Sequence, residues 1–144
     1  MIWLLDTNVV SEMWKPLPNP TVTAWLQGAM DDCALSEITF GELHYGVHRL
    51  PFGKRRSELL RHISFLREDY RDVILPFGPA EAEAWGEYAA QVQAGRGDTF
   101  WTARTTRDSA IAATARAWGL IVVTRDTVHF PFVETLNPFE PIPN

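Results

Sequence analysis

Four acidic residues from distant parts of the chain are the side chains best suited to do chemistry. Asp6 and Asp126 each follow a short apolar run of strand length. Glu42 lies in an expected helix that follows another such run, and Asp108 is expected to open a later helix. In an open α/β sheet the carboxyl ends of the strands form the ligand-binding edge, so we expect the four carboxylates to converge there.

Such a gathering of carboxylates needs a cation. At an effective dielectric constant of about 20, two carboxylates about 4–5 Å apart repel each other by about 3–4 kcal/mol. Mg²⁺ and Mn²⁺ prefer oxygen ligands, and they can polarise a phosphodiester and activate a bound water. The acids therefore predict a Mg²⁺ or Mn²⁺ site for phosphodiester hydrolysis. A zinc site is not expected, because the chain has no HExxH pattern and no cysteine partners for its histidines, which are His44, His48, His62 and His129.

Each acid also has an ordinary structural explanation when it is taken alone. Asp6 could form a turn at a strand end with Asn8 capping the first helix, and Asp126 could be a turn residue. Asp108 could cap its own helix, which is worth roughly 0.5–2 kcal/mol. Glu42 could lie on a solvated helix face. It is the joint pattern, four acids near the ends of elements, that favours a functional site.

The elements that must position these acids alternate between strands and helices. Strands are expected at 2–5, 33–36, 73–75 and 120–124, with a poorer candidate at 132–136. Helices are expected at 20–30, 36–50, 54–70, 79–93 and 108–118. This order predicts an α/β fold with a mainly parallel central sheet of four to five strands flanked by helices. We expect residues 1–144 to form a single domain.

The composition fits a globular cytoplasmic protein. Of the 144 residues, 46% are hydrophobic and 22% are charged, and no segment reaches the roughly 20 apolar residues of a membrane span. The single cysteine, Cys33, excludes an internal disulfide and suits a reducing compartment. A net charge of −5 does not exclude a nucleic-acid partner, because a bound cation would offset the four acids. The tail at 137–144 is expected to be extended, packing loosely or against a partner.

The motifs around the acids resemble those of the PIN-domain ribonucleases, most closely the VapC-type toxins of bacterial toxin–antitoxin pairs and their FitB-like branch. The matching segments are Leu5-Asp6-Thr7-Asn8-Val9-Val10-Ser11-Glu12, then 36–43 with Gly46, then Asp108-Ser109-Ala110-Ile111-Ala112-Ala113, and finally Val123-Thr124-Arg125-Asp126. The resemblance implies a PIN-like fold in which Asp6, Glu42 and Asp108 bind Mg²⁺ or Mn²⁺, with Asp126 as a more variable fourth acid. It also implies that three polar neighbours orient ligands or contact phosphate, namely Thr7, Asn8 and Thr124.

Two segments depart from the family pattern. His129 stands where a carboxylate is usual after the fourth strand, which leaves Asp126 as the only acid there. The stretch 97–107 is longer than usual and carries Trp101, Arg104 and Arg107. It could contact RNA, with the tryptophan stacking on a base and the arginines on phosphates. An ordinary surface insertion is the favoured interpretation.

The resemblance implies a metal-dependent endoribonuclease that acts as the toxin of a VapBC-type pair. It further implies a homodimer and a VapB-type antitoxin that covers the acidic groove and inserts a basic side chain. Its apolar anchors are expected on the helices within 20–70, although Trp14 and Trp25 could equally be core residues. The alternative is a non-catalytic PIN-like module that binds RNA or protein. A phospho-receiver domain is disfavoured because Leu75 is followed directly by Pro76-Phe77-Gly78 and not by an aspartate. An aspartyl phosphatase is disfavoured because Asn8 replaces the second aspartate it would need.

Overall fold

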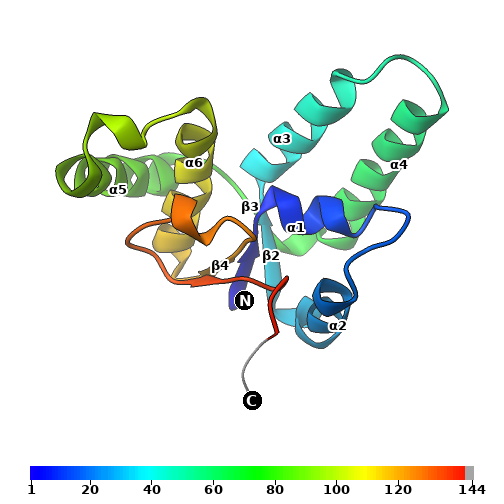
Figure 1. Cartoon of the computed structure of the whole chain (residues 1–144), viewed down its shortest axis with the longest axis horizontal. Coiled ribbons are helices and arrows are strands. Elements are labelled where there is room, and N and C mark those ends of the chain that lie inside the picture. Colours follow the sequence, from blue (N-terminus) through cyan, green and yellow to red (C-terminus); the bar gives the residue numbers. More distant parts are fainter. Residues whose placement is uncertain (142–144) are drawn as a thin grey trace.

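The computed structural model describes residues 1–141, so 142–144 of the predicted tail lie outside the described residues. A single five-stranded sheet runs through the middle of the molecule, with every neighbouring pair of strands parallel and the order β3-β2-β1-β4-β5 (Figure 1). The strands are β1 (Trp3–Leu5), β2 (Cys33–Ser36), β3 (Ile74–Leu75), β4 (Ile121–Val123) and β5 (Thr135–Leu136). The predicted α/β class and parallel sheet are confirmed.

In the described part of the chain, six α-helices connect and cover the strands. They are α1 (Thr7–Glu12), α2 (Pro20–Ala29), α3 (Glu37–His48), α4 (Lys54–Asp69), α5 (Pro79–Arg96) and α6 (Ala103–Trp118). Local capping explains several of the boundaries. The side chains of Asn19 and Ser36 accept hydrogen bonds from the first turns of α2 and α3. Gly119 ends α6 in the left-handed conformation, with φ at 66°, which costs a glycine little.

The sheet separates two hydrophobic clusters. Successive residues of a strand point to opposite faces, so Leu4 belongs to one cluster and Leu5 to the other. The first cluster packs β1, β2 and β4 against α1 to α4, and the second packs them against α5 and α6. Figure 1 shows α5 and α6 on one side of the sheet and the α3–α4 pair on the other. Both faces are therefore covered, as the continuous apolar strands predicted.

The order of the strands creates a crevice at their carboxyl ends. The chain leaves β1 for β2 on one side, and reaches β4 on the other side only after β3, α5 and α6. Ligand sites of open α/β sheets lie where the strand order reverses in this way. Here the reversal falls between β1 and β4. A 2.9 Å hydrogen bond from Asp6 N to Val123 O connects the carboxyl ends of these two strands.

Two predictions about helix boundaries were wrong. Helix α6 begins at Ala103, capped by Thr102, so Asp108 lies in its second turn and does not open it. The alternative in which Asn8 caps α1 is also excluded, because the cap is Asp6, whose carboxylate accepts a hydrogen bond from Thr7 N. Helix α5 continues to Arg96, so the connection to α6 is shorter than expected. Four of the strands are also shorter than the apolar runs that predicted them, whereas β2 has the predicted bounds.

Within residues 1–141, no helix is long and apolar enough to cross a membrane. The described part of the C-terminal tail is held against the body of the protein. Pro138 is buried, and Phe139 packs against the first hydrophobic cluster. The expectation of loose packing is therefore wrong for these two residues.

Candidate active site at the carboxyl edge of the sheet

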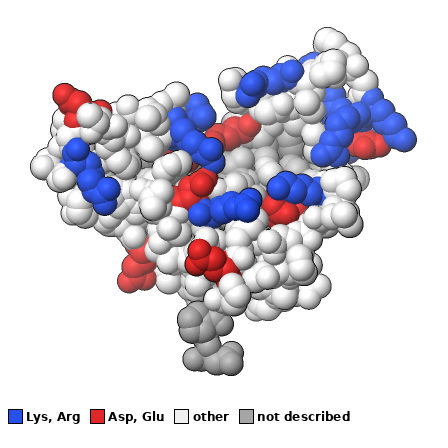
Figure 2. Space-filling view, in the orientation of Figure 1, with Lys and Arg blue, Asp and Glu red and all other residues white. Residues whose placement is uncertain are grey.

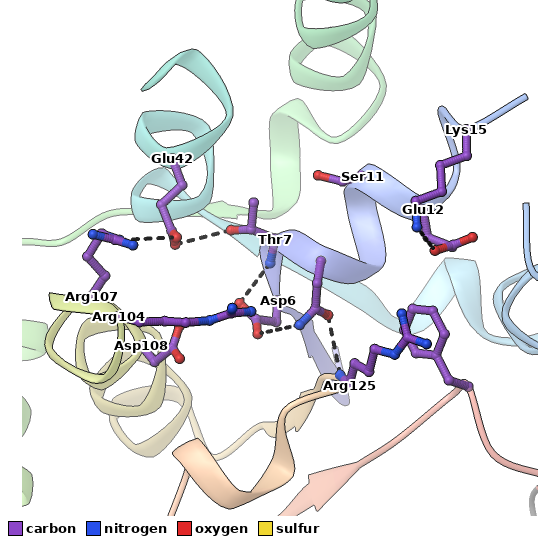
Figure 3. Close-up of a pocket in the computed structure, with 12 residues that line it drawn as sticks. Asp6, Thr7, Ser11, Glu12, Lys15, Glu42, Arg104, Arg107, Asp108 and Arg125 are labelled. Carbon is purple, nitrogen blue, oxygen red and sulfur yellow. Dashed lines mark hydrogen bonds and ion pairs between the residues drawn. The ribbon is translucent and has the colours of Figure 1, made fainter. Parts of the chain in front are cut away.

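A cavity of about 350 Å³ opens at the carboxyl ends of β1 and β4 (Figure 3). Three of the four predicted acids line it, although they come from three different elements: Asp6 from the cap of α1, Glu42 from α3 and Asp108 from α6. The other lining residues are Thr7, Asn8, Ser11, Glu12, Lys15, Arg104, Arg107, Arg125 and Phe139. The fold thus brings Asp6, Glu42 and Asp108 to one place.

Asp6 is the most enclosed of the three acids. Its Oδ1 accepts a 2.8 Å hydrogen bond from Thr7 N, and its Oδ2 accepts bonds from Thr124 Oγ1 at 2.7 Å and from Asn8 Nδ2 at 3.3 Å. Burial raises the pKa of the Asp6 carboxyl, and the negative charge of Asp126 adds to that effect, while the two strongest hydrogen bonds work against it. The hydrogen bonds fix the orientation of Asp6.

Glu42 reaches the cavity from the second turn of α3. Its Oε1 accepts a 3.1 Å hydrogen bond from Thr7 Oγ1, and its Oε2 lies 3.8 Å from Nε of Arg107. Burial raises the pKa of this carboxyl, and the neighbouring Asp6 raises it further. Thr7 therefore serves two acids at once, because its backbone binds Asp6 and its hydroxyl binds Glu42.

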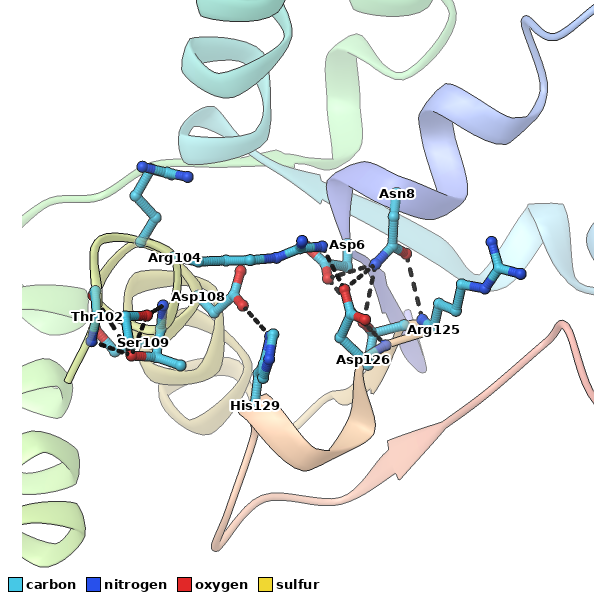
Figure 4. A network of polar contacts seen from close by, with 12 residues as sticks. Asp6, Asn8, Thr102, Arg104, Asp108, Ser109, Arg125, Asp126 and His129 are labelled. Atoms are coloured by element: carbon cyan, nitrogen blue, oxygen red, sulfur yellow. Dashed lines mark hydrogen bonds and ion pairs between the residues drawn. The ribbon is translucent and has the colours of Figure 1, made fainter. Parts of the chain in front are cut away.

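Asp108 faces the same cavity from the opposite side, on α6. Its only hydrogen-bond partner among the described residues is His129, whose Nδ1 lies 3.1 Å from Oδ2 (Figure 4). Burial raises the pKa of Asp108 to about 7, with further contributions from the charges of Asp6 and Glu42. The position where a family carboxylate was expected is thus filled by an imidazole that contacts one of the acids directly.

Asp126 lies beside the cavity and not among its lining residues. Its Oδ2 accepts a hydrogen bond from Asn8 Nδ2 at 3.1 Å and is also paired with the guanidinium of Arg104 (Figure 4). Thr124 Oγ1 accepts a 3.0 Å bond from Asp126 N while it donates to Asp6. Asn8 and Thr124 therefore link Asp126 to Asp6. Asp126 is thus connected to the cavity through these two side chains and does not line it.

The donor chemistry of the cavity fits a hard divalent cation. Three carboxylates converge, all with pKa values raised by burial, and Asp6 adds to the rise at Glu42 and Asp108. This is the state expected of acids whose charges lack compensation. Within residues 1–141, no three Asp, Glu, His or Cys side chains are already close enough to hold one metal ion. Glu42 and Asp108 would have to turn towards Asp6 to share a cation.

Several cavity residues were not identified from the sequence. Arg104 and Arg107 were placed in an expected surface insertion, but they belong to the first turns of α6 and line the cavity. Arg104 precedes Asp108 by four residues and Arg107 precedes it by one. A correct prediction of the helix start would therefore have placed both arginines near Asp108. Glu12 lies four residues after Asn8 on α1, the spacing of one helix face, but only the structure shows its cavity position.

Other aromatic and imidazole residues have structural contacts. Trp101 is half-buried against the second cluster and donates a 2.8 Å hydrogen bond to Gln93 Oε1. Trp14 and Trp25, which the sequence left open, are partly buried against the first cluster. His44 and His48 stack on each other at a ring separation of 6.0 Å on α3.

Comparisons with known proteins agree with this arrangement. The PIN domain family model matches residues 3–133. VapC ribonuclease Y4jK of Sinorhizobium fredii is 36% identical over 142 residues, covering 96% of this chain and 98% of the relative. Toxin FitB of Neisseria gonorrhoeae is 36% identical over 140 residues, covering 96% of each.

The fold likeness extends over the same length. A chain in a structure of FitAB bound to the IR36 DNA fragment superposes with a TM-score of 0.87 at 32% sequence identity, covering 98% of both chains. The acids that line the cavity come from the segments whose motifs carried the resemblance. This chain belongs to the PIN domain family.

Proposed function

We propose that this protein is a Mg²⁺- or Mn²⁺-dependent endoribonuclease that hydrolyses RNA phosphodiester bonds. The observation that carries the proposal is the convergence of Asp6, Glu42 and Asp108 on one cavity, with all three carboxyl pKa values raised. Buried acids with unfavourable ionisation are typical of functional sites. PIN-domain membership and a relative that bears the name ribonuclease favour nuclease chemistry over other uses of such a site.

Asp6, Glu42 and Asp108 are the proposed metal ligands, and Asp126 would assist from beside the cavity. A bound divalent cation would polarise the phosphodiester and lower the pKa of an attacking water. Thr7, Asn8 and Thr124 hold the acids in place through the hydrogen bonds described above. His129 orients Asp108. These contacts limit the motion of the ligand set, which is the usual role of groups behind metal ligands.

We further propose that the chain, as a single PIN-like domain over 1–144, is the toxin of a VapBC-type pair. Its relatives include a protein named as a toxin and a chain from a FitAB assembly. A VapB-type antitoxin would cover the acidic cavity, and its basic side chain would compensate the carboxylates. The proposed state is a cytoplasmic homodimer that forms a larger assembly with the antitoxin.

The test is RNA cleavage by the purified full chain with Mg²⁺, with Mn²⁺ and with EDTA, together with growth inhibition on expression in bacteria. We expect cleavage only with a divalent cation, and loss of both cleavage and growth inhibition in Asp6→Ala and Asp108→Ala. Co-expression of the antitoxin should restore growth. Full toxicity in both variants would refute the assignment of these acids. Metal-independent RNA binding without cleavage would identify a non-catalytic module instead.

A further inference from the structure

Two arginines of α6 stand at the mouth of the acidic cavity. Arg104 and Arg107 are one helical turn apart, and Arg107 directly precedes Asp108. Their side chains are 58% and 49% exposed, whereas the carboxylates they face, Asp126 and Glu42, are only 27% and 20% exposed. In Figure 2, basic side chains border the hollow in the visible face and acidic ones lie beside them. The guanidinium groups are thus more exposed to solvent than the carboxylates that they face.

The other two cations of the cavity are already engaged. Lys15 Nζ lies 2.9 Å from Oε1 of the buried Glu12. The guanidinium of Arg125 lies 4.5 Å from the ring centre of Phe139, so it is stacked on an aromatic face. By contrast, among residues 1–141 the guanidinium of Arg107 has only the loose 3.8 Å approach to Glu42 and makes no hydrogen bond. Arg104 is held by Asp126 at an exposed ion pair, which water and salt weaken.

We propose that Arg104 and Arg107 form a phosphate clamp that binds the RNA backbone as it enters the cavity. This inference rests on the proposed nuclease function. A guanidinium presents paired N–H donors that match phosphate oxygens. Because Arg104 and Arg107 line the same cavity as the proposed metal ligands, a phosphate held by them would lie next to those ligands. The pair therefore positions the substrate, and it does not take part in bond breaking.

Charge explains why such a clamp is needed. The chain carries a net charge of −5, and the cavity gathers acids that repel phosphate. A divalent cation compensates the ligands, but it leaves the approach to the site uncompensated. Two exposed arginines at the mouth supply the attraction there. Their present ion pairs with Asp126 and Glu42 are loose or exposed, so RNA phosphates can replace those carboxylates without breaking a buried interaction.

The test is binding of fluorescein-labelled single-stranded oligouridylate to the full chain in EDTA, where no cleavage occurs, across a salt series. For single strands each phosphate contact contributes about −0.7 to the slope of log K against log salt. We expect Arg104→Ala and Arg107→Ala each to flatten the slope by about 0.7 and to weaken binding roughly tenfold at low salt. Lysine replacements should restore the slope and only part of the affinity.

Arg71→Ala is the matched control. Arg71 is exposed, and because it precedes β3 it lies towards the amino edge of the sheet, away from the cavity. Its replacement by alanine removes one positive charge, as each single arginine variant of the clamp does. An unchanged slope in the double Arg104→Ala, Arg107→Ala variant, with a melting curve like that of the control, would overturn the clamp.

Separate measurement of cleavage with Mn²⁺ distinguishes the two proposals. If the wild-type chain cleaves RNA but the double variant keeps its salt slope, the clamp fails and the nuclease function stands. If RNA binding depends on both arginines but no divalent cation supports cleavage, the clamp stands and the nuclease function fails. When both hold, the double variant should raise KM much more than it lowers kcat, because the arginines position the substrate.

Discussion

The cavity contains two kinds of buried carboxylate. Glu12 is 5% exposed, and Asp108 is also 5% exposed, so burial alone does not distinguish them. The carboxylate of Glu12 pairs with Lys15 Nζ at 2.9 Å and accepts a 2.9 Å hydrogen bond from Asn19 N. These contacts hold the pKa of Glu12 below its usual value. The pKa values of Asp6, Glu42 and Asp108 are raised instead.

The two kinds of acid differ in the position of the nearest positive charge. Glu12 obtains one from Lys15, in the turn that follows its own helix, and its charged form stabilises the fold. Asp6, Glu42 and Asp108 face one another across the cavity, and the cations nearest to them stay at the mouth. A buried acid with its own partner needs no further cation, whereas three acids without such a partner fit the proposed cation site.

The two kinds of acid should differ most strongly in how their contribution to folding stability depends on pH. The pKa of Asp108 is about 7 in the fold against an ordinary 3.8, so the stability it contributes is complete below the ordinary value and is lost as pH rises through about 7. For Glu12 the sign is opposite: its contribution is present above the ordinary 4.5 and is lost as pH falls through the lower folded pKa.

Melting curves of the metal-free protein across this pH range check the signs. Asp108→Asn should remove part of the decline that accompanies a rise in pH from 3.8 to about 7, and Glu12→Gln should remove part of the decline that accompanies a fall in pH below 4.5. The same loss of stability with rising pH in Asp108→Asn as in the wild type would contradict the pKa assignment.

Divalent cation should stabilise the protein through one set of acids only. A ligand at 100 times its Kd adds about 2.7 kcal/mol to the free energy of unfolding. We expect saturating Mn²⁺ to raise the melting temperature of the wild type and of Glu12→Gln, and to leave that of Asp108→Asn unchanged. Differential scanning fluorimetry at pH above 7 measures this. Equal Mn²⁺ shifts in all three proteins would place the ion elsewhere.

Glu12→Gln should lower stability without removing activity. The substitution removes the charge that binds Lys15 and Asn19 N, and hydrogen bonds to a charged group contribute about 2 kcal/mol. Urea unfolding of the variant measures the loss, and RNA cleavage at a temperature where the variant stays folded measures the activity. Complete inactivation of a folded Glu12→Gln would place Glu12 among the functional acids.

Thr124→Val should have the smallest effect of the series. The hydroxyl of Thr124 orients Asp6 and accepts from Asp126 N, and loss of a group behind a metal ligand lowers metal affinity or activity by about tenfold. Mn²⁺ affinity by titration calorimetry checks this, with Thr124→Ser as the control that keeps the hydroxyl. A serine variant as weak as the valine variant would show that the methyl group and not the hydroxyl matters.

Much of the fold followed from local patterns. The apolar runs ending at Asp6 and Asp126 predicted the two strands that frame the site, since strands buried on both faces are continuously apolar. The caps Asn19 and Ser36 fixed two helix starts. The start of α6 could not be read in this way, because Thr102 caps it within a stretch without apolar periodicity. Because of that error, the predicted site did not include Arg104 and Arg107.

The site itself was predictable only in part. The expected positions of Asp6, Glu42 and Asp108 near element ends indicated convergence, because a parallel sheet brings such ends together, although Asp108 lies in the second turn of its helix. The separate position of Asp126 depends on the Asn8 bridge and on Arg104, which are contacts between residues more than 20 positions apart. The structural role of Glu12 depends on the hydrogen bond from Asn19 N across the turn after α1. Such contacts leave no periodic pattern in the sequence.

The most direct measurement is the position of Mn²⁺ in crystals of the full chain, found from its anomalous scattering. We predict one ion in the cavity, coordinated by oxygens of Asp6 and Asp108 with Glu42 turned towards it, while Glu12 keeps its contact with Lys15. An ion bound by Glu12, or by residues outside the cavity, would contradict it.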